Sequence, residues 1–384
     1  MAHCVTNKAF ALLAWSVAAV RSETSLSRQY PEIYVDTGGH QTSMTDAIHS
    51  ENVTKWFIDH ISGVSPPLSF ELITGGRSNL TYKVTDAEKK GYVLRRPPLG
   101  HVLQSAHDMG REYKIISCLG PTDIPVPPSF GLCKDKSVNG ADFYVMGLVE
   151  GDVYVDSIDA VAIPENERYD LGMDVIDVLV RLHNIDPDEV GLGDLGKKED
   201  YVARQVRRWT RQWEESKTDD VPEMDEAGRL LKENMPDQIG ASIAHGDYRI
   251  GNFIIRDSRV AAVLDWELCT LGDPLADVGY LLNWWYRPDE VELGEGDGAP
   301  TAVGGFPSRE DLIGYYENGT GRDLSQVDYY RAFSYWRLAA ISQGVYRRYV
   351  EGVMADTSEI EASYYKRRML SLSKAAMELL KSFR

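Results

Sequence analysis

Short apolar segments separated by turn residues predict a small β-sheet in the first third of the chain. Residues 68–73 and 80–84 are candidate strands on either side of a Gly-Gly turn, and residues 92–95 form a third. A run of apolar residues at 143–149 is typical of a buried strand. We therefore expect an antiparallel sheet that ends near residue 150.

Apolar residues at three- and four-residue spacing predict helices for most of the remaining chain. Helices are expected at 45–61 and 100–119, within the same part of the chain as the sheet. From about residue 153 the pattern is mainly helical, with apolar stripes in 171–182, 197–213 and 328–350. Together these patterns predict the α+β class, with a small antiparallel sheet followed by a larger, mainly helical part.

The segment 241–267 has a different pattern and carries most of the candidate chemistry. Its sequence, ASIAHGDYRIGNFIIRDSRVAAVLDWE, predicts a short strand, a polar loop, and then two strands joined by a tight charged turn. A hairpin this tight brings the ends of its strands together. We therefore expect Asp247 and Asn252, in the loop before the hairpin, to share one pocket with Asp265, at the end of its second strand.

The spacing His245-x-Asp247-x4-Asn252, followed by Asp265, indicates phosphoryl transfer. That chemistry needs a carboxylate to orient and deprotonate a hydroxyl, and two oxygen ligands for a Mg²⁺ ion that bridges nucleotide phosphates. Asp and Asn are also common turn formers, which would explain any one of these residues alone. The four together match the arrangement H-x-D-x4-N…D of kinases.

The segments HGDYRIGNFII and VLDWELCTLGDPLADVGYLL resemble the aminoglycoside phosphotransferase-like (choline-kinase-like) family of small-molecule kinases. Within that family the chain is most similar to the branch containing the kinase domain attached to some acyl-CoA dehydrogenases, over residues 48–349. The resemblance implies a protein-kinase-like fold of two lobes. The N-lobe would comprise residues 44–149, and the helical C-lobe residues 150–384 with the catalytic hairpin.

The resemblance also implies roles for the residues of the hairpin. Asp247 would position and deprotonate the acceptor hydroxyl, and His245 would brace the loop. Asn252 and Asp265 would hold Mg²⁺. Asp277, in the helix that follows, would tie that helix back to the catalytic loop.

In the expected N-lobe the resemblance implies a nucleotide site for ATP. Arg95 would contact the α- and β-phosphates in place of the usual lysine, with Arg96 as the alternative, and Glu112 would pair with that cation. Backbone groups from Met146 to Leu148 would bind adenine. The turn that would fold over the phosphates consists of Gly75, Gly76, Arg77, Ser78 and Asn79.

Composition narrows the possible partners and the compartment. With 384 residues and a net charge of −18, the chain lacks the basic excess that nucleic acid binding requires. The four cysteines show no disulfide or zinc spacing, which favours a reducing compartment.

An apolar run at 9–20 is too short to span a membrane, and we expect residues 1–43 to be a poorly ordered extension. An ATP-dependent enzyme of this composition is expected in the cytoplasm.

Three functional hypotheses follow. The first is an ATP- and Mg²⁺-dependent kinase whose acceptor is a hydroxyacyl compound, such as a 4-hydroxy acid or its CoA thioester. The second is an aminoglycoside O-phosphotransferase. The third, from another class, is a nucleotide-binding pseudokinase, because the chain has arginine in the lysine position and an incomplete glycine motif. The pattern leaves open whether the arginines at 337, 347 and 348 face a pocket or water, and allows those in 197–213 to bind an anionic arm of the substrate.

Overall fold

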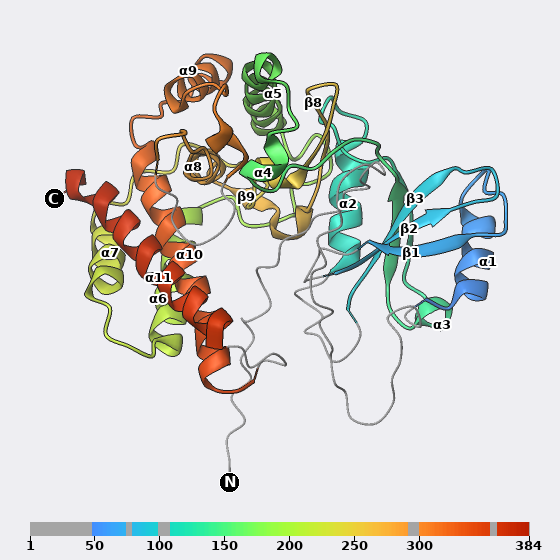
Figure 1. The fold of residues 1–384 in the computed structure, drawn as a ribbon, viewed down its shortest axis with the longest axis horizontal. Coiled ribbons are helices and arrows are strands. Elements are labelled where there is room, and N and C mark those ends of the chain that lie inside the picture. The colour runs from blue at the N-terminus through green and yellow to red at the C-terminus, as the bar shows by residue number, and fades with distance from the viewer. Residues whose placement is uncertain (1–47, 74–78, 99–107, 291–298, 354–358, 384) are drawn as a thin grey trace, which may run out of the picture.

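A computed structural model describes residues 48–73, 79–98, 108–290, 299–353 and 359–383. The sheet with its helices forms one side of the molecule and a larger helical part forms the other (Figure 1). The predicted architecture is therefore confirmed. The expected extension at 1–43 lies outside the described residues, as do Gly75, Gly76, Arg77 and Ser78 of the predicted phosphate turn.

The N-lobe is built on one antiparallel sheet of five strands in the order β1-β2-β3-β5-β4. Their bounds are Ser69–Ile73 (β1), Leu80–Thr85 (β2), Gly91–Arg96 (β3), Ser129–Cys133 (β4) and Phe143–Gly147 (β5). The lobe also contains three helices, α1 (Ser50–His60), α2 (Met109–Leu119) and the short α3 (Lys136–Asn139).

The two faces of this sheet are covered by different helices. Tyr92 and Leu94 of β3 lie in one cluster with Trp56 of α1, whereas Val93 lies in another with Ile116 of α2. Successive side chains of a strand point to opposite faces. This alternation decides which of the consecutive arginines at the end of β3 faces α2.

Helix α2 is shorter than the sequence predicted. We expected it over 100–119, but it begins at Met109, because the carboxylate of Asp108 accepts the backbone N–H of Arg111 and caps the first turn. Residues 99–107 lie outside the described residues. The cap aligns the helix so that Glu112, in its first turn, faces the sheet.

The C-lobe is mainly helical and includes two small antiparallel strand pairs. Strand β6 (Ser242–Ala244) pairs with β9 (Thr270–Gly272), and β7 (Phe253–Arg256) pairs with β8 (Arg259–Val263). The second pair is the predicted hairpin. The α-helices are α4 (Ser157–Ala160), α5 (Glu165–Asn184), α6 (Tyr201–Ser216), α7 (Pro222–Glu233), α8 (Leu275–Asn283), α9 (Arg309–Thr320), α10 (Val327–Val350) and α11 (Glu359–Leu380).

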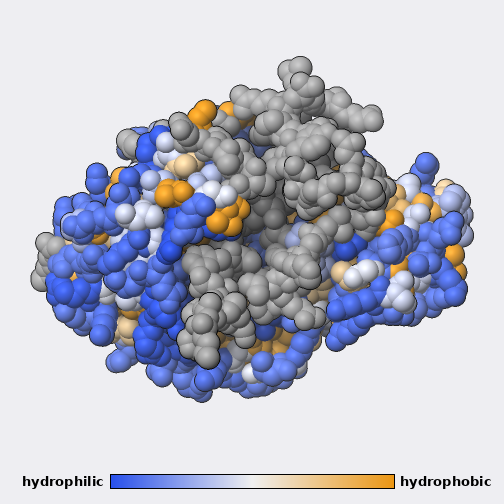
Figure 2. All heavy atoms as spheres, turned by 90° about the horizontal axis from the view of Figure 1, so that it is seen from below, coloured by the Kyte–Doolittle hydropathy of each residue, from blue (hydrophilic) through white to orange (hydrophobic). Residues whose placement is uncertain are grey.

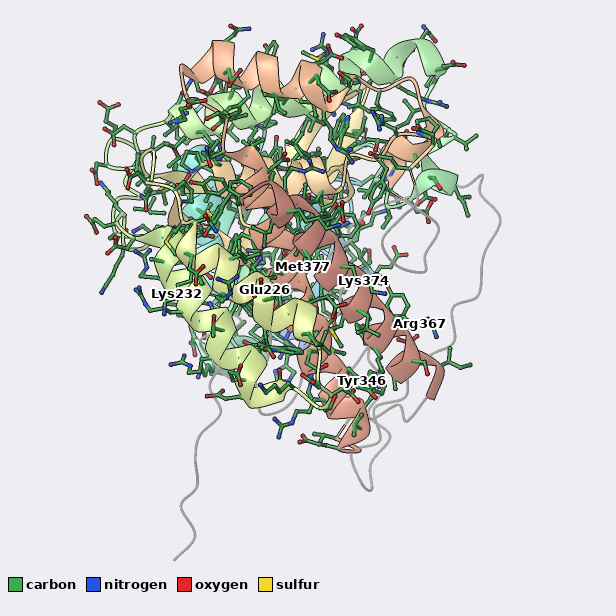
Figure 3. All side chains as sticks on the ribbon, turned by 90° about the vertical axis from the view of Figure 1, so that its left-hand side faces the viewer. Glu226, Lys232, Tyr346, Arg367, Lys374 and Met377 are labelled. Carbon is green, nitrogen blue, oxygen red and sulfur yellow. The ribbon has the colours of Figure 1, made fainter. Side chains whose placement is uncertain are left out.

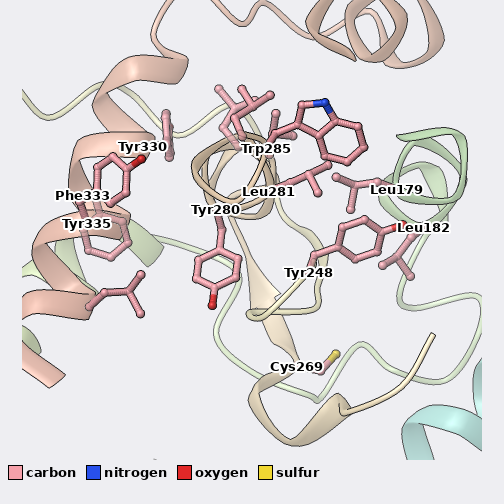
Figure 4. Packing of buried hydrophobic residues seen from close by; sticks show 14 of the residues in the cluster. Leu179, Leu182, Tyr248, Cys269, Tyr280, Leu281, Trp285, Tyr330, Phe333 and Tyr335 are labelled. Atoms are coloured by element: carbon pink, nitrogen blue, oxygen red, sulfur yellow. The ribbon is translucent and has the colours of Figure 1, made fainter. Parts of the chain in front are cut away.

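Helix α8 lies at the centre of the C-lobe core. Figure 4 shows Leu281 of α8 and Trp285, just after the end of the helix, between Tyr330 of α10 and Leu179 of α5. On the far side of α10, helices α7 and α11 lie side by side, with labelled residues of both visible in Figure 3. Because α8 is buried from both sides, it gives the loops that precede it a rigid support.

The described surface is largely hydrophilic in the view of Figure 2, with small separate apolar patches. Among the described residues, no helix combines the length and the apolar character that crossing a membrane would require.

The contact between α8 and α10 generates a stability prediction. A Cβ added at Gly279 of α8 would lie 2.8 Å from the backbone carbon of Tyr330 and 2.9 Å from the backbone nitrogen of Arg331. Alanine favours a helix over glycine by about 1 kcal/mol, but a backbone clash in a packed core costs about 1–3 kcal/mol. We expect Gly279→Ala to lower the free energy of unfolding in a urea titration.

The matched control is Gly314→Ala in α9, where an added Cβ would meet nothing within 4 Å. This substitution is expected to raise the free energy of unfolding by about 0.5–1 kcal/mol, since it only reduces the entropy of the unfolded chain. If both variants shifted the unfolding midpoint in the same direction, the proposed close contact between α8 and α10 would be wrong.

Candidate active site

The loop after β6 is held from inside by His245. This fully buried imidazole makes a 2.9 Å hydrogen bond from Nε2 to the carbonyl oxygen of Leu264, and its Nδ1 accepts the backbone N–H of Asp247 at 3.2 Å. Gly246 has φ of +86°, and a Cβ there would lie 2.9 Å from the carbonyl oxygen of Leu268. The loop therefore has one tight conformation, in which the hydrogen bond to His245 fixes the backbone of Asp247.

Asp277 of α8 holds the same loop from the other side. Its two carboxylate oxygens accept the backbone N–H groups of His245 at 2.6 Å and Gly246 at 2.8 Å, and His183 of α5 approaches at 3.4 Å. Burial by itself raises the pKa of Asp277, but the hydrogen bonds from His183 and the Gly246 N–H hold that pKa below its ordinary value. Asp277 thus stays ionised and links α8 to the loop, as the resemblance implied.

The carboxylate of Asp247 is surrounded by donors. Its Oδ2 accepts the side-chain amide of Asn252 at 2.7 Å, and its Oδ1 accepts the hydroxyl of Tyr280. Arg249 forms an ion pair with the same Oδ1 at 3.6 Å. The sequence analysis predicted neither Arg249 nor Tyr280 as a neighbour of Asp247. Arg249 was detectable, since it lies in the same loop, but Tyr280 comes from α8, thirty-three positions further along the chain.

A backbone hydrogen bond connects the segments of Asn252 and Asp265, whose side chains both carry oxygen atoms suited to a cation. The amide nitrogen of Asn252 donates to both the backbone oxygen and the side chain of Asp247, at 2.7 Å each, whereas its Oδ1 is buried and has no hydrogen-bond partner. The backbone oxygen of Asn252 accepts the N–H of Leu264, which directly precedes Asp265. Asp265 has φ of +64°, a left-handed conformation that asparagine and aspartate tolerate best.

This pair fits Mg²⁺, which prefers oxygen ligands, one or two of them from the protein. An unpartnered buried acceptor costs free energy, and a cation would remove that cost. The part of the chain that the structure describes contains no cluster of three His, Cys, Asp or Glu side chains suited to a metal. A cation held by Asn252 and Asp265 would therefore need further oxygens from a bound nucleotide or from water.

Arg95 connects the sheet to this site. Its guanidinium lies 3.4 Å from Glu112 of α2 and 3.4 Å from Asp265, and all three side chains are buried. Burial lowers the pKa of Arg95, but the charge of Glu112 and then that of Asp265 more than offset this, so the pKa lies above its ordinary value. Arg96 points to the other face of the sheet, where it donates to the carbonyl oxygen of Asn139. Of the two alternatives, Arg95 is the one that faces the predicted metal residues.

Glu112 is held by two further side chains. Asn79, the one described residue of the predicted phosphate turn, donates to Oε1 at 3.1 Å, and the hydroxyl of Tyr144 donates to Oε2 at 3.0 Å. Burial raises the pKa of Glu112, while Arg95 opposes that rise. No local pattern pointed to Tyr144, because its partner lies thirty-two residues earlier, on another element.

The predicted adenine-binding segment follows the centre of the sheet. Met146 is buried and pairs with Val93, whereas Leu148 is only partly buried and donates its N–H to the carbonyl oxygen of Gly91 at 3.4 Å. Shortly afterwards Asp152 pairs with Ile255 through two 2.8 Å backbone hydrogen bonds. The segment therefore passes directly from the sheet to the catalytic hairpin.

The chain is similar to curated proteins named as members of the acyl-CoA dehydrogenase family. The chain is 36% identical over 330 residues to acyl-CoA dehydrogenase family member 11 of Gallus gallus, a match covering 82% of this chain and 40% of that protein. It is 35% identical over 320 residues to family member 10 of Mus musculus, covering 82% of this chain and 29% of that protein. The chain thus spans well under half the length of these curated relatives.

Among solved structures, a Ralstonia eutropha protein provisionally named an aminoglycoside phosphotransferase is 34% identical, with a TM-score of 0.74, and covers 86% of this chain and 98% of that one. Choline kinase from Cryptosporidium parvum shares the fold, with a TM-score of 0.61 at 14% identity, over 87% of this chain and 97% of its own. The sequence profile of the phosphotransferase enzyme family matches residues 69–309. The chain therefore belongs to this phosphotransferase family of small-molecule kinases.

Proposed function

We propose that the protein transfers the γ-phosphoryl group of ATP, with Mg²⁺, to a hydroxyl group of a small molecule. The observation that carries this proposal is the amide of Asn252. Its nitrogen holds the carboxylate of Asp247, its buried side-chain oxygen has no partner among the described residues, and its backbone oxygen accepts the N–H of Leu264, the residue before Asp265. One side chain thus joins a candidate base to a candidate metal site, which is the arrangement that phosphoryl transfer needs.

In this proposal Asp247 accepts the proton of the acceptor hydroxyl. The donors Asn252 and Tyr280 keep its carboxylate in one orientation, which reduces the reorganisation needed during the reaction. Bound MgATP would supply the phosphoryl group and a cation that neutralises charge on the phosphates. Asn252 and Asp265 would hold that cation. Arg95, fixed by Glu112, would contact the phosphates next to it.

The acceptor that we propose is a hydroxyacyl compound, either a 4-hydroxy acid or its CoA thioester. The support is the likeness, at 35–36% identity, to proteins named for acyl-CoA dehydrogenases. An aminoglycoside is the second candidate, favoured by the name of the Ralstonia protein. To distinguish the two candidate acceptors, a pool of each compound is offered with γ-labelled ATP and Mg²⁺. The Asp247→Asn variant serves as the blank. Nucleotide binding without label on any alcohol would favour the pseudokinase alternative.

We also propose the lobe boundaries at 44–149 and 150–384, and a cytoplasmic location. The boundary follows the last strand of the sheet, β5, which ends at Gly147. For the location, the support is the expected use of ATP and the state of the described cysteines, Cys118, Cys133 and Cys269, all of which are unpaired.

The roles in the hairpin predict two different defects. Asp247→Ala is expected to lower kcat by about 10²–10⁴ with nucleotide affinity retained, because only proton transfer and hydroxyl positioning are lost. Asp265→Ala is expected to weaken Mg²⁺-dependent nucleotide binding by at least about tenfold, because a charged metal ligand is lost. Steady-state kinetics and calorimetric titration of MgADP measure the two effects. Asp257→Asn in the exposed hairpin turn is the control, and normal turnover in both alanine variants would contradict the assignment.

The two consecutive arginines of β3 give a second prediction. Arg95 approaches Glu112 through Nη1 and Asp265 through Nη2, and the single ammonium nitrogen of lysine does not reproduce this fork, so Arg95→Lys is expected to weaken nucleotide affinity by about tenfold while the protein stays folded. Arg96→Lys, on the opposite face of the sheet, should leave that affinity unchanged. The measurement is titration with a fluorescent ATP analogue, with the thermal midpoint of each variant recorded alongside. The reverse ranking would reassign the phosphate contact to Arg96.

A further inference from the structure

One face of α10 carries arginines toward the catalytic loop. Arg337, Ile341, Gly344 and Arg348 follow one another at intervals of four, three and four residues, so they share one side of the helix. At the start of this face, Arg337 donates to the carbonyl oxygen of Gly246 at 3.2 Å. Its guanidinium also lies over the ring of Tyr280, 5.4 Å from the centroid. Since the hydroxyl of Tyr280 binds Asp247, Arg337 is one side chain away from the proposed base.

A second arginine approaches from α6, which packs along α10. Near the end of α6, Gln343 of α10 donates to the carbonyl oxygen of Ser216 at 2.8 Å. Two turns earlier in α6, Arg208 lies over the ring of Trp209, 5.1 Å from the centroid, and within electrostatic range of Arg337. Burial lowers the pKa of Arg208, and the positive charges of Arg337 and Arg211 lower it further. Two partly buried cations therefore lie on packed helices, and one of them, Arg337, contacts the catalytic loop.

Neither cation has a carboxylate partner among the residues that the structure describes. Arg309 and Arg331, also in the C-lobe, each form an ion pair with an acidic side chain, whereas Arg208 and Arg337 form none. The Nε atom of Arg337 is buried and lacks a hydrogen-bond partner within the described part of the chain. The chain has 59 acidic residues against 41 basic ones, so a shortage of carboxylates does not explain why Arg208 and Arg337 lack an acidic partner among the described residues.

Holding like charges together in a partly buried place is unfavourable, and a buried donor without an acceptor adds to the cost. A bound anion would remove both penalties, because a guanidinium donates two parallel hydrogen bonds to a carboxylate or a phosphate. The place next to Asp247 is where an acceptor must lie if its hydroxyl is to reach the base. The far end of an acceptor that extends from Asp247 past Tyr280 would therefore contact the arginines.

We propose that Arg337 and Arg208 form an anion subsite for the acceptor, which binds a carboxylate or phosphate group of the molecule whose hydroxyl faces Asp247. This inference rests on the proposed function and narrows the acceptor to anionic hydroxyl compounds. Arg348 extends the same face about 16 Å further along α10, at 1.5 Å per residue. A short hydroxy acid would reach only Arg337 and Arg208, whereas a long acceptor with a distant phosphate would also reach Arg348. A polycationic acceptor would be repelled.

The test is calorimetric binding of two anionic probes to the full chain with its nucleotide site saturated by a non-hydrolysable ATP analogue and Mg²⁺. The probes are 4-hydroxybutyrate, which carries a carboxylate, and coenzyme A, which carries phosphates. At least one is expected to bind. Arg208→Gln and Arg337→Gln should each weaken that binding at least about tenfold, since each removes a charge-assisted contact. Arg207→Gln, at the exposed neighbouring position on α6, should leave it unchanged.

Additional measurements separate the proposal from a structural role and from the proposed function. Removing one of two like charges should leave the thermal midpoint of Arg208→Gln unchanged or raised, whereas a structural arginine would lower it. Weaker binding of coenzyme A, but not of 4-hydroxybutyrate, in Arg348→Gln would identify the anion as a distant phosphate. Failure of wild-type protein to bind either probe, or equal binding by all variants, would overturn the subsite. Binding without phosphoryl transfer would leave the subsite standing and count against the proposed function.

Discussion

The geometry of this site depends on the carboxylate of Asp277. It accepts the N–H groups of two consecutive loop residues, His245 and Gly246, and is itself supported by His183. Backbone donors in a tight loop have no partners within the loop, so a buried anion satisfies them at a fixed distance. Helix α8, which carries Asp277, is packed between α5 and α10 (Figure 4). The core thereby determines where the catalytic loop lies.

The same helix links the two halves of the proposed reaction. One turn after Asp277, Tyr280 donates its hydroxyl to Asp247 and places its ring under Arg337. Asp247 in turn accepts the amide of Asn252, whose backbone oxygen accepts the N–H of the residue before Asp265. A chain of direct contacts therefore runs from the arginine face of α10 to the candidate metal site. A shift of α8 would displace both ends together.

Electrostatics divides the site into two sides. Toward the sheet, the charge of Arg95 is paired with the carboxylates of Glu112 and Asp265, which is how a buried charge is tolerated, although its Nε is buried without a hydrogen-bond partner among the described residues. Toward α6 and α10, Arg208 and Arg337 have no such compensation among the described residues. On the first side, charges of both signs are present, and the pair of Arg95 with Asp265 joins a strand of the sheet to the catalytic hairpin. The second is completed only by a negative group from outside, which is why we assign it to the acceptor.

The local features of this protein could be predicted from its residues alone. The spacing of His245, Asp247 and Asn252 and the hairpin that follows could be predicted because turns and strand alternation depend on neighbouring residues. The choice between Arg95 and Arg96 could not, because alternation says that they point to opposite faces but not which face meets α2. The partners Tyr144, Tyr280 and Arg337 were also decided only by the tertiary structure. These contacts join residues 32 or more positions apart, and packing between whole elements, which no local pattern encodes, brings them together.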